Sequence, residues 1–160
     1  MRIIKAPEEY QPHPAEVSIF LAGGISGCPD WQSELADLLR NDPGLEQLPL
    51  VLLNPRRVNY PWHDPSKARE QIAWEHRHLA RATAVSFWFP CETLAPITLF
   101  EYGKCLVGQQ PLFVGVHPDY SRRLDLEIQT DLQRPQLQLV DSVADLARVI
   151  AQWLQSGPRL

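Results

Sequence analysis

Short apolar runs alternate along the chain with segments in which apolar residues recur every three or four positions. The apolar runs are rich in β-branched and aromatic residues and predict strands at residues 17–21, 50–53, 83–89, 112–116 and 137–140. The helical spacing predicts helices over residues 29–41, 67–82, 96–107 and 142–156. The run at 83–89 is almost wholly apolar, which is typical of a central strand in a parallel sheet.

Strands that alternate with helices in this way predict βαβ units and therefore a parallel sheet. We expect an α/β fold with a five-stranded parallel sheet in flavodoxin-like order and helices on both faces. In that order, the ligand crevice lies beside the first and third strands. The loops after Leu21, Leu53 and Phe89 would meet there. Candidate chemistry is therefore sought in those loops.

The remainder of the chain predicts no second domain. Residues 1–16 contain three prolines, which predict an extended lead-in and no regular helix. Residues 17–157 are expected to form one domain, because the sequence shows no repeat, low-complexity tract or linker. Residues 117–135 are polar and mixed, which predicts a loop with at most a short helix.

Composition and charge narrow the range of partners. The chain has 160 residues, of which 44% are hydrophobic and 21% charged, which is ordinary for a globular domain. A net charge of −4 argues against a nucleic-acid polymer, which requires clustered Lys and Arg. The arginine pairs at 56–57 and 122–123 are expected to be solvated loop charges. A small phosphate-bearing ligand stays open.

Cysteine and histidine spacing indicates neither a disulfide framework nor a metal site. Cys28, Cys91 and Cys105 are an odd number without metal-type spacing. His76 and His78 are two residues apart and would not share a helix face. No apolar run approaches the roughly 18 residues of a membrane span, and the first residues lack the apolar segment of a signal peptide. We expect a cytoplasmic protein without membrane contact.

The stretch from Phe87 to Gly103 holds the strongest candidate for chemistry. A strand, a polar loop and a helix place Glu101 just beyond the C-terminal end of a strand, where α/β folds carry their active sites. Gly103 favours close packing of this helix on the sheet, since glycine costs about 1 kcal/mol in a helix interior. The alternative from the residues alone is a solvated Glu101 beside Lys104. Glu75, on the preceding helix, likewise belongs either to the site or to a solvated helix face.

Two loops are candidates for ligand contact. In the loop at residues 23–27, Gly23 and Gly24 would let backbone N–H groups approach a ligand near a helix start. The loop lacks the dinucleotide and phosphate-loop patterns, and a plain tight turn would use glycines too. In the long loop after the second strand, Trp62 either offers a stacking face or simply packs against the protein.

These residues resemble the nucleoside 2-deoxyribosyltransferase family, which includes related nucleotide N-glycosidases. The matching segments occur in the same order, namely residues 19–27, the strand end Asn54-Pro55, residues 74–89 and residues 100–103. They cover roughly residues 17–116. The resemblance implies a Rossmann-like parallel sheet, in agreement with the fold that the hydrophobic pattern predicts.

The resemblance also assigns roles to the acids. It implies that Glu101, in the Glu-x-Gly motif, is the nucleophile, and that Glu75 stands where the family commonly has an Asp as its second acid. Two positions depart from the family. Phe20 replaces a Tyr whose hydroxyl orients the nucleophile, and Ala95 replaces an Asp or Ser six residues before Glu101.

The expected function is cleavage or transfer of the N-glycosidic bond of a (deoxy)nucleoside or nucleotide through a covalent ester on Glu101. Glu75 or Glu92 would protonate or hold the departing base. No metal or organic cofactor is expected, and the resemblance implies a homo-oligomer, because family members pair subunits to complete the site. Substrate contacts are expected from Gly23, Gly24, Ser26, Asn54, Trp62, Glu92, Thr93 and Thr98.

The alternative is a non-catalytic nucleotide-binding or sensing module of the same fold, which Phe20 and Ala95 favour. Glu92, Thr93 and Thr98 are the nearby polar residues that would have to replace the side chain missing at Ala95. In the family's nucleotide hydrolases a basic residue stands about where this chain has Ser26, so the resemblance leaves a 5′-phosphate contact unassigned.

Overall fold

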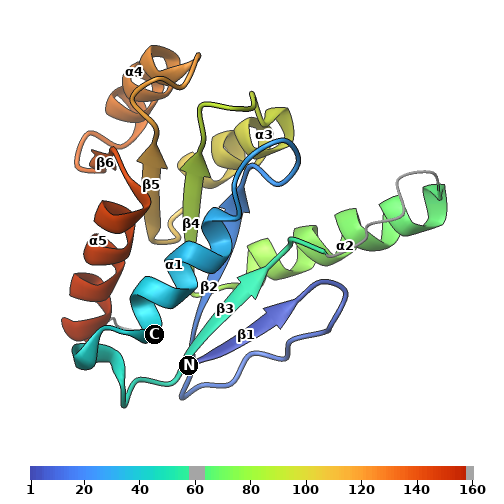
Figure 1. The fold of residues 1–160 in the computed structure, drawn as a ribbon, viewed down its shortest axis with the longest axis vertical. Coiled ribbons are helices and arrows are strands. Elements are labelled where there is room, and N and C mark those ends of the chain that lie inside the picture. The colour runs from blue at the N-terminus through green and yellow to red at the C-terminus, as the bar shows by residue number, and fades with distance from the viewer. Residues whose placement is uncertain (58–63, 158–160) are drawn as a thin grey trace.

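The protein folds around one parallel sheet, shown as a ribbon in Figure 1. The structure is a computed structural model that describes residues 1–57 and 64–157. The strands lie in the order β1-β3-β2-β4-β5-β6. Their bounds are β1 Arg2–Lys5, β2 Val17–Gly23, β3 Leu50–Asn54, β4 Ala84–Phe89, β5 Leu112–Val116 and β6 Leu139–Val140. The α/β class is thereby confirmed.

The number of strands was predicted wrongly, because the sheet has six and not five. The five predicted strands are present in flavodoxin-like order, and the additional strand is β1, in the lead-in at residues 1–16. The strand pairs in parallel with the outer edge of β3, with Ile3 opposite Leu52 and Ile4 opposite Leu53. The three prolines of the lead-in all come after β1, so they do not interrupt its hydrogen bonds.

Five α-helices lie in the described residues: α1 Trp31–Arg40, α2 Pro65–Arg81, α3 Pro96–Leu106, α4 Arg123–Gln133 and α5 Val143–Gln155. Three of them begin with a polar cap. Asp30, Asp64 and Ser142 accept hydrogen bonds from first-turn N–H groups of α1, α2 and α5. The expected start of the first helix at Pro29 is two residues too early, since Asp30 is the cap and the helix begins at Trp31.

Helix α4 was not predicted at its full length of 11 residues. Its apolar residues do not follow one buried stripe, because Leu124, Ile128 and Leu132 are exposed while Leu126 and Thr130 face the core. Arg134, just beyond the helix, donates hydrogen bonds to the carbonyl groups of Leu106 and Gln110. Tertiary contacts with α3 thus hold a helix whose apolar stripe faces solvent.

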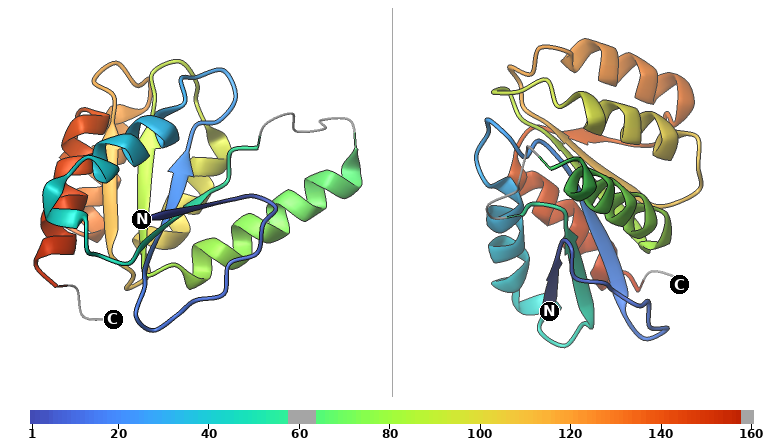
Figure 2. Two further views of the ribbon diagram at one scale, coloured as in Figure 1. Left: turned by 60° about the horizontal axis from the view of Figure 1, so that its bottom comes forward. Right: turned by 90° about the vertical axis from the view of Figure 1, so that its right-hand side faces the viewer.

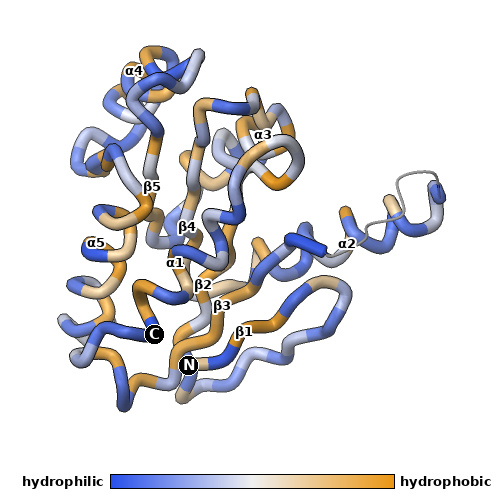
Figure 3. Tube along the Cα trace, viewed as in Figure 1, coloured by the Kyte–Doolittle hydropathy of each residue, from blue (hydrophilic) through white to orange (hydrophobic). Residues whose placement is uncertain are grey.

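The helices cover both faces of the sheet, as Figure 2 shows. On one face α1 and α5 pack Trp31, Leu35 and Ile150 against strand residues such as Ile19 and Leu21. On the other face α2, α3 and α4 pack against the alternate strand residues, which include Phe20, Phe87 and Val114. Figure 3 shows the same arrangement as hydrophobic colour gathered along the central strands. Because successive side chains of a strand point to opposite faces of the sheet, the strand residues are divided between two cores.

The segment after β1 is attached to α2 through the buried His78. The His78 ring stacks on Trp74 with centroids 4.1 Å apart. Its Nε2 accepts the backbone N–H of Tyr10 at 3.1 Å, and its Nδ1 lies 2.8 Å from the Trp74 carbonyl oxygen. The Trp74 indole in turn donates to the carbonyl of Glu8 at 2.7 Å. The lead-in is therefore part of the folded core.

We expect His78→Ala to lower the free energy of unfolding by about 2–4 kcal/mol, because it leaves a cavity and an unpaired buried N–H at Tyr10. Urea denaturation measures the change. The matched control is His76→Ala on the exposed side of the same helix, which should change stability by less than about 0.5 kcal/mol. Equal effects of the two substitutions would contradict this account of the lead-in.

Candidate active site

A cavity of about 790 Å³ lies at the C-terminal ends of β2, β3 and β4. It is formed where the expected loops meet and falls within the size range of small-molecule sites. Its lining comes from the end of β2 and its loop, the residues after β3, one side of α2, and the start of α3: Phe20, Ala22, Gly23, Gly24, Ile25, Ser26, Pro55, Arg56, Arg57, Gln71, Glu75, Thr93, Ala95, Pro96, Ile97, Thr98 and Glu101.

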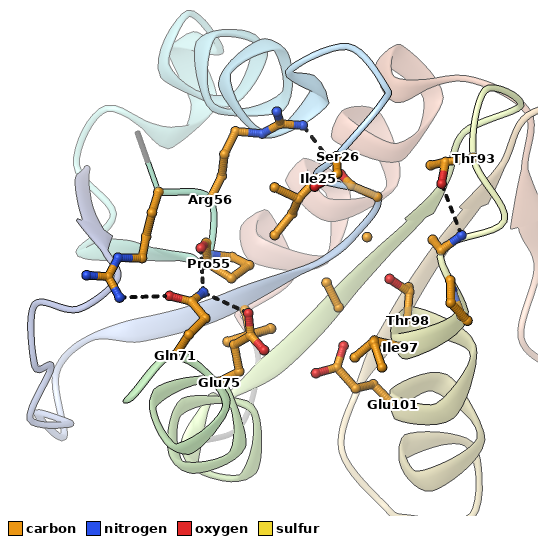
Figure 4. A pocket seen from close by; sticks show the side chains of 17 residues that line it. Ile25, Ser26, Pro55, Arg56, Gln71, Glu75, Thr93, Ile97, Thr98 and Glu101 are labelled. Atoms are coloured by element: carbon orange, nitrogen blue, oxygen red, sulfur yellow. Dashed lines mark hydrogen bonds between the residues drawn. The ribbon is translucent and has the colours of Figure 1, made fainter. Parts of the chain in front are cut away.

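Two carboxyl groups face this cavity from different helices, as Figure 4 shows. Glu75 is carried by α2 and Glu101 by the second turn of α3. Burial and, to a smaller extent, the charge of Glu75 raise the pKa of Glu101 to about 7, although Lys104 opposes the shift. Burial also raises the pKa of Glu75, while a hydrogen bond from Gln71 opposes that rise. Neither acid is the solvated surface group that the residues alone allowed.

The glycine loop (residues 23–27) borders the cavity. A network of hydrogen bonds to the carbonyl oxygen of Gly24 holds it in place. This oxygen accepts hydrogen bonds from the Trp31 indole at 2.9 Å, from Gln32 at 3.3 Å and from Arg56 at 3.4 Å. Gly23 has no room for a side chain, because a Cβ there would lie 2.6 Å from the Trp88 carbonyl oxygen. The glycines are thus required by close packing at the cavity wall.

Arg56 and Arg57 do not have the solvated surroundings expected of them. Their side chains are only 20% and 14% exposed. Arg56 donates to Gln32 at 2.9 Å and to the Pro29 carbonyl at 2.9 Å, so it ties the end of β3 to the glycine loop. Because both arginines line the cavity, its β3 side is basic and its helical side carries the two acids.

The N-terminus of α3 opens onto the cavity without a side-chain cap. Ala95 occupies the cap position in the left-handed region, at φ 45°, and Pro96 follows it. Among the described residues, nothing accepts the N–H groups of Ile97 and Thr98 or bonds the Thr98 hydroxyl. Thr98 is nevertheless only 4% exposed and lines the cavity. These donors can bind an oxygen of a ligand.

The expected site residues separate into three groups. The cavity brings together Gly23, Gly24, Ser26, Thr93, Thr98, Glu75 and Glu101. Two others lie elsewhere. Asn54 is buried and accepts the Arg56 backbone N–H at 2.9 Å, and the exposed Glu92 borders a separate cavity of about 120 Å³ beside His117. Trp62 lies outside the described residues.

A family comparison adds to this geometry. The sequence model described as "nucleoside 2-deoxyribosyltransferase like" matches residues 16–120. The chain belongs to the nucleoside 2-deoxyribosyltransferase-like family. A search of curated proteins finds no match. In this member of the family, Phe20 is buried and packs on Trp74 with ring centroids 6.0 Å apart. Its ring offers the Glu101 carboxyl no hydroxyl.

Three features of the site differ from the sequence interpretation or were missed by it. Gly103 does not serve close packing, because a Cβ there would meet nothing within 4 Å. Gln71 and Arg56 were missed. The signal for Gln71 was its position four residues before Glu75, on the same helix face. The signal for Arg56 was its place directly after the Asn54-Pro55 strand end.

The described residues contain neither a candidate metal cluster nor a candidate membrane-spanning helix. No group of three or more His, Cys, Asp or Glu side chains there could hold a metal ion. No helix in residues 1–57 or 64–157 has the length and apolar character to cross a membrane. Of the two histidines on α2, His78 is used in packing and His76 is exposed.

The raised pKa of Glu101 has a consequence for stability. The folded protein binds this proton more tightly than the unfolded chain, whose carboxyl has a pKa near 4.5. Ionised Glu101 therefore costs stability as the pH rises from 4.5 through 7. Glu101→Gln should raise the unfolding free energy at pH 8 by up to about 3 kcal/mol and by much less at pH 5.

Denaturation of both forms at the two pH values measures this difference. Glu46→Gln is the control, because Glu46 is exposed and distant from the cavity. A gain in stability that is the same at pH 5 and pH 8 would show that Glu101 is not held in a dehydrated environment.

Proposed function

We propose that the protein cleaves or transfers the N-glycosidic bond of a nucleoside or nucleotide, with Glu101 as the nucleophile. The observation that carries the proposal is the pair of carboxyl groups, Glu75 and Glu101, facing one partly dehydrated cavity of about 790 Å³. Membership of the nucleoside 2-deoxyribosyltransferase-like family supports the substrate class. Perturbed pKa values at paired acids are typical of acid–base and nucleophilic sites.

The reaction divides between the two acids. Ionised Glu101 attacks the anomeric carbon, the carbon–nitrogen bond breaks, and its electron pair goes to the base, which takes a proton from Glu75. Water or a second base then attacks the same carbon, the ester to Glu101 breaks, and Glu75 regains a proton. The pair must therefore hold one proton at the start. The pKa of about 7 for Glu101 means that the pair holds about one proton near neutral pH, and this proton has to lie on Glu75 when Glu101 attacks.

The remaining donors of the cavity fit the polar part of the substrate. The uncapped N-terminus of α3, with the Thr98 hydroxyl, lies one helical turn before Glu101 and can bind sugar or phosphate oxygens. The glycine loop and Ser26 form the facing wall. Water acting in the second step gives a hydrolase, and a second base gives a transferase.

A second candidate is a module that binds the nucleotide without turnover. The observation in its favour is that Phe20 leaves the Glu101 carboxyl without the hydroxyl that would orient it, and that Ala95 leaves the α3 cap empty. Titration calorimetry with nucleosides and their monophosphates separates the two functions, because a sensor would bind them and release no free base.

Activity depends on Glu101 in the first proposal. We expect the wild type to release or exchange the base of at least one deoxynucleoside or deoxynucleotide, and Glu101→Ala to lower that rate at least about 10³-fold. Glu92→Ala should retain the rate, since Glu92 borders the other cavity. Chromatography of free and exchanged bases measures the reaction.

A 2-fluoro nucleoside should also trap the ester, and the mass of the peptide containing Glu101 would increase accordingly. If the wild type and Glu101→Ala are equally inert on nucleosides and on their monophosphates, the enzymatic proposal fails.

We also propose that the protein is a homo-oligomer, as the family resemblance implies. Helices α3 and α4 contact each other through the hydrogen-bonded pair Tyr102 and Thr130, and Figure 2 shows them side by side. Their outward faces expose large apolar side chains, an arrangement that marks interaction surfaces. These side chains are Ile97, Phe100, Val107, Leu124, Ile128 and Leu132.

The double substitution Phe100→Asp and Ile128→Asp should lower the mass in solution to that of one 18.3 kDa chain, because it places charges on this face. Light scattering after size-exclusion chromatography measures the mass. Leu38→Asp is the control, since Leu38 is exposed on α1 on the opposite side of the sheet. A wild type that is already monomeric would refute the oligomer proposal.

A further inference from the structure

Gln71 links the end of β3 to the Glu75 carboxyl. It lies on α2, one helical turn before Glu75, and is only 8% exposed. Its Nε2 donates to the carbonyl oxygen of Pro55 at 2.8 Å and to Oε1 of Glu75 at 2.8 Å. Its Oε1 accepts a hydrogen bond from Nη1 of Arg57 at 3.4 Å. Every polar atom of this buried side chain therefore has a partner, as Figure 4 shows.

The partners fix the orientation of the Gln71 amide. Pro55 and ionised Glu75 offer only acceptors, so the NH₂ group must face them, and Arg57 offers only donors, so the oxygen must face it. A flipped amide would place two acceptors against its oxygen and two donors against each other. One orientation alone satisfies all three neighbours, and the rotamer of Glu75 depends on it.

From this geometry we propose that Gln71 is a positioning residue that holds Glu75 toward Glu101 and directs the proton of Glu75 to Oε2. The inference deepens the proposed function and rests on it for its catalytic meaning. Because Oε1 accepts the Gln71 N–H, a proton on Glu75 resides on Oε2, the oxygen left for the cavity. A leaving base would take its proton from that atom.

Gln71 also adjusts the strength of Glu75 as an acid. Burial favours the protonated form of Glu75 and raises its pKa. The donated hydrogen bond favours the ionised form and opposes that rise in pKa. The charged and titratable neighbours are Arg57 and Arg56 beyond β3, Glu70 on α2, and Lys104 and Cys105 beside Glu101 on α3. The facing residues of β2, Phe20 and Ala22, are apolar.

The test uses the full-length protein and Gln71→Met, which keeps the length of the side chain and removes its N–H donors. Carbon-13 NMR titration of the Glu75 carboxyl should show its pKa raised by about one pH unit in the variant. Gln71→Asn, one methylene shorter, cannot span Pro55 and Glu75 and should produce a shift in the same direction. Gln71→Asn provides the test if Gln71→Met does not fold.

The control is Gln110→Met, because Gln110 also donates to two backbone carbonyls, those of Leu79 and Ala82, outside the cavity. It should lower stability without moving the Glu75 titration. Unchanged titration of Glu75 in both Gln71 variants would overturn the inference. The NMR titration needs no substrate, so its result does not depend on whether the protein has glycosidic activity.

Where base release is measurable, a second readout follows. The alkaline limb of the pH profile of kcat/KM should move upward by the same amount in Gln71→Met, and kcat should fall at least about 10-fold. A lower rate with both limbs of the profile unmoved would mean that Gln71 supports only the fold. An inert wild type whose Glu75 still shifts on substitution would refute the proposed function and leave the role of Gln71 in place.

Discussion

The structure depends on the burial of two carboxyl groups at the one edge where parallel strands β2, β3 and β4 end. Burying one acid is costly, and burying a second near it costs more, because the charge of Glu75 adds to the rise in the pKa of Glu101. The fold tolerates the cost by keeping a proton on the pair near neutral pH, as the pKa of about 7 at Glu101 indicates. Such a pair contributes little to stability, which is consistent with the chemical role proposed for it.

The surrounding residues are arranged to support that pair. Arg56 ties β3 to the glycine loop, and Gln71 ties β3 to Glu75, so both walls of the cavity depend on the strand end at Asn54-Pro55. Asn54 contributes through the Arg56 backbone and not through the ligand cavity. A short motif at one strand end therefore shapes the site chiefly through the side chains that it holds, since of its two residues only Pro55 lines the cavity.

The hydrophobic pattern was sufficient for the α/β class, because four of the five predicted strands are largely buried apolar runs, and it located four of the five helices of the described residues. The pattern failed where partners lie far apart in sequence. Strand β1 exists because its two isoleucines meet the open edge of β3, and α4 exists because Thr130 and Arg134 bond to α3. Neither contact can be read from its own segment, because β1 has only four residues and the periodic apolar residues of α4 face solvent.

The candidate site was predictable to the extent that topology fixes it. Glu101 follows a central strand, so its place at the cavity follows from the order of the sheet. Side-chain direction does not follow, which is why Glu92, only three residues beyond the end of the same strand, turns toward the cavity beside His117 instead. Arg56 and Gln71 are buried because three elements meet around them. The charge pattern of the neighbouring sequence could not predict this burial. The residues that decide the chemistry of an acid pair are thus its hydrogen-bond partners, and these are settled by tertiary structure.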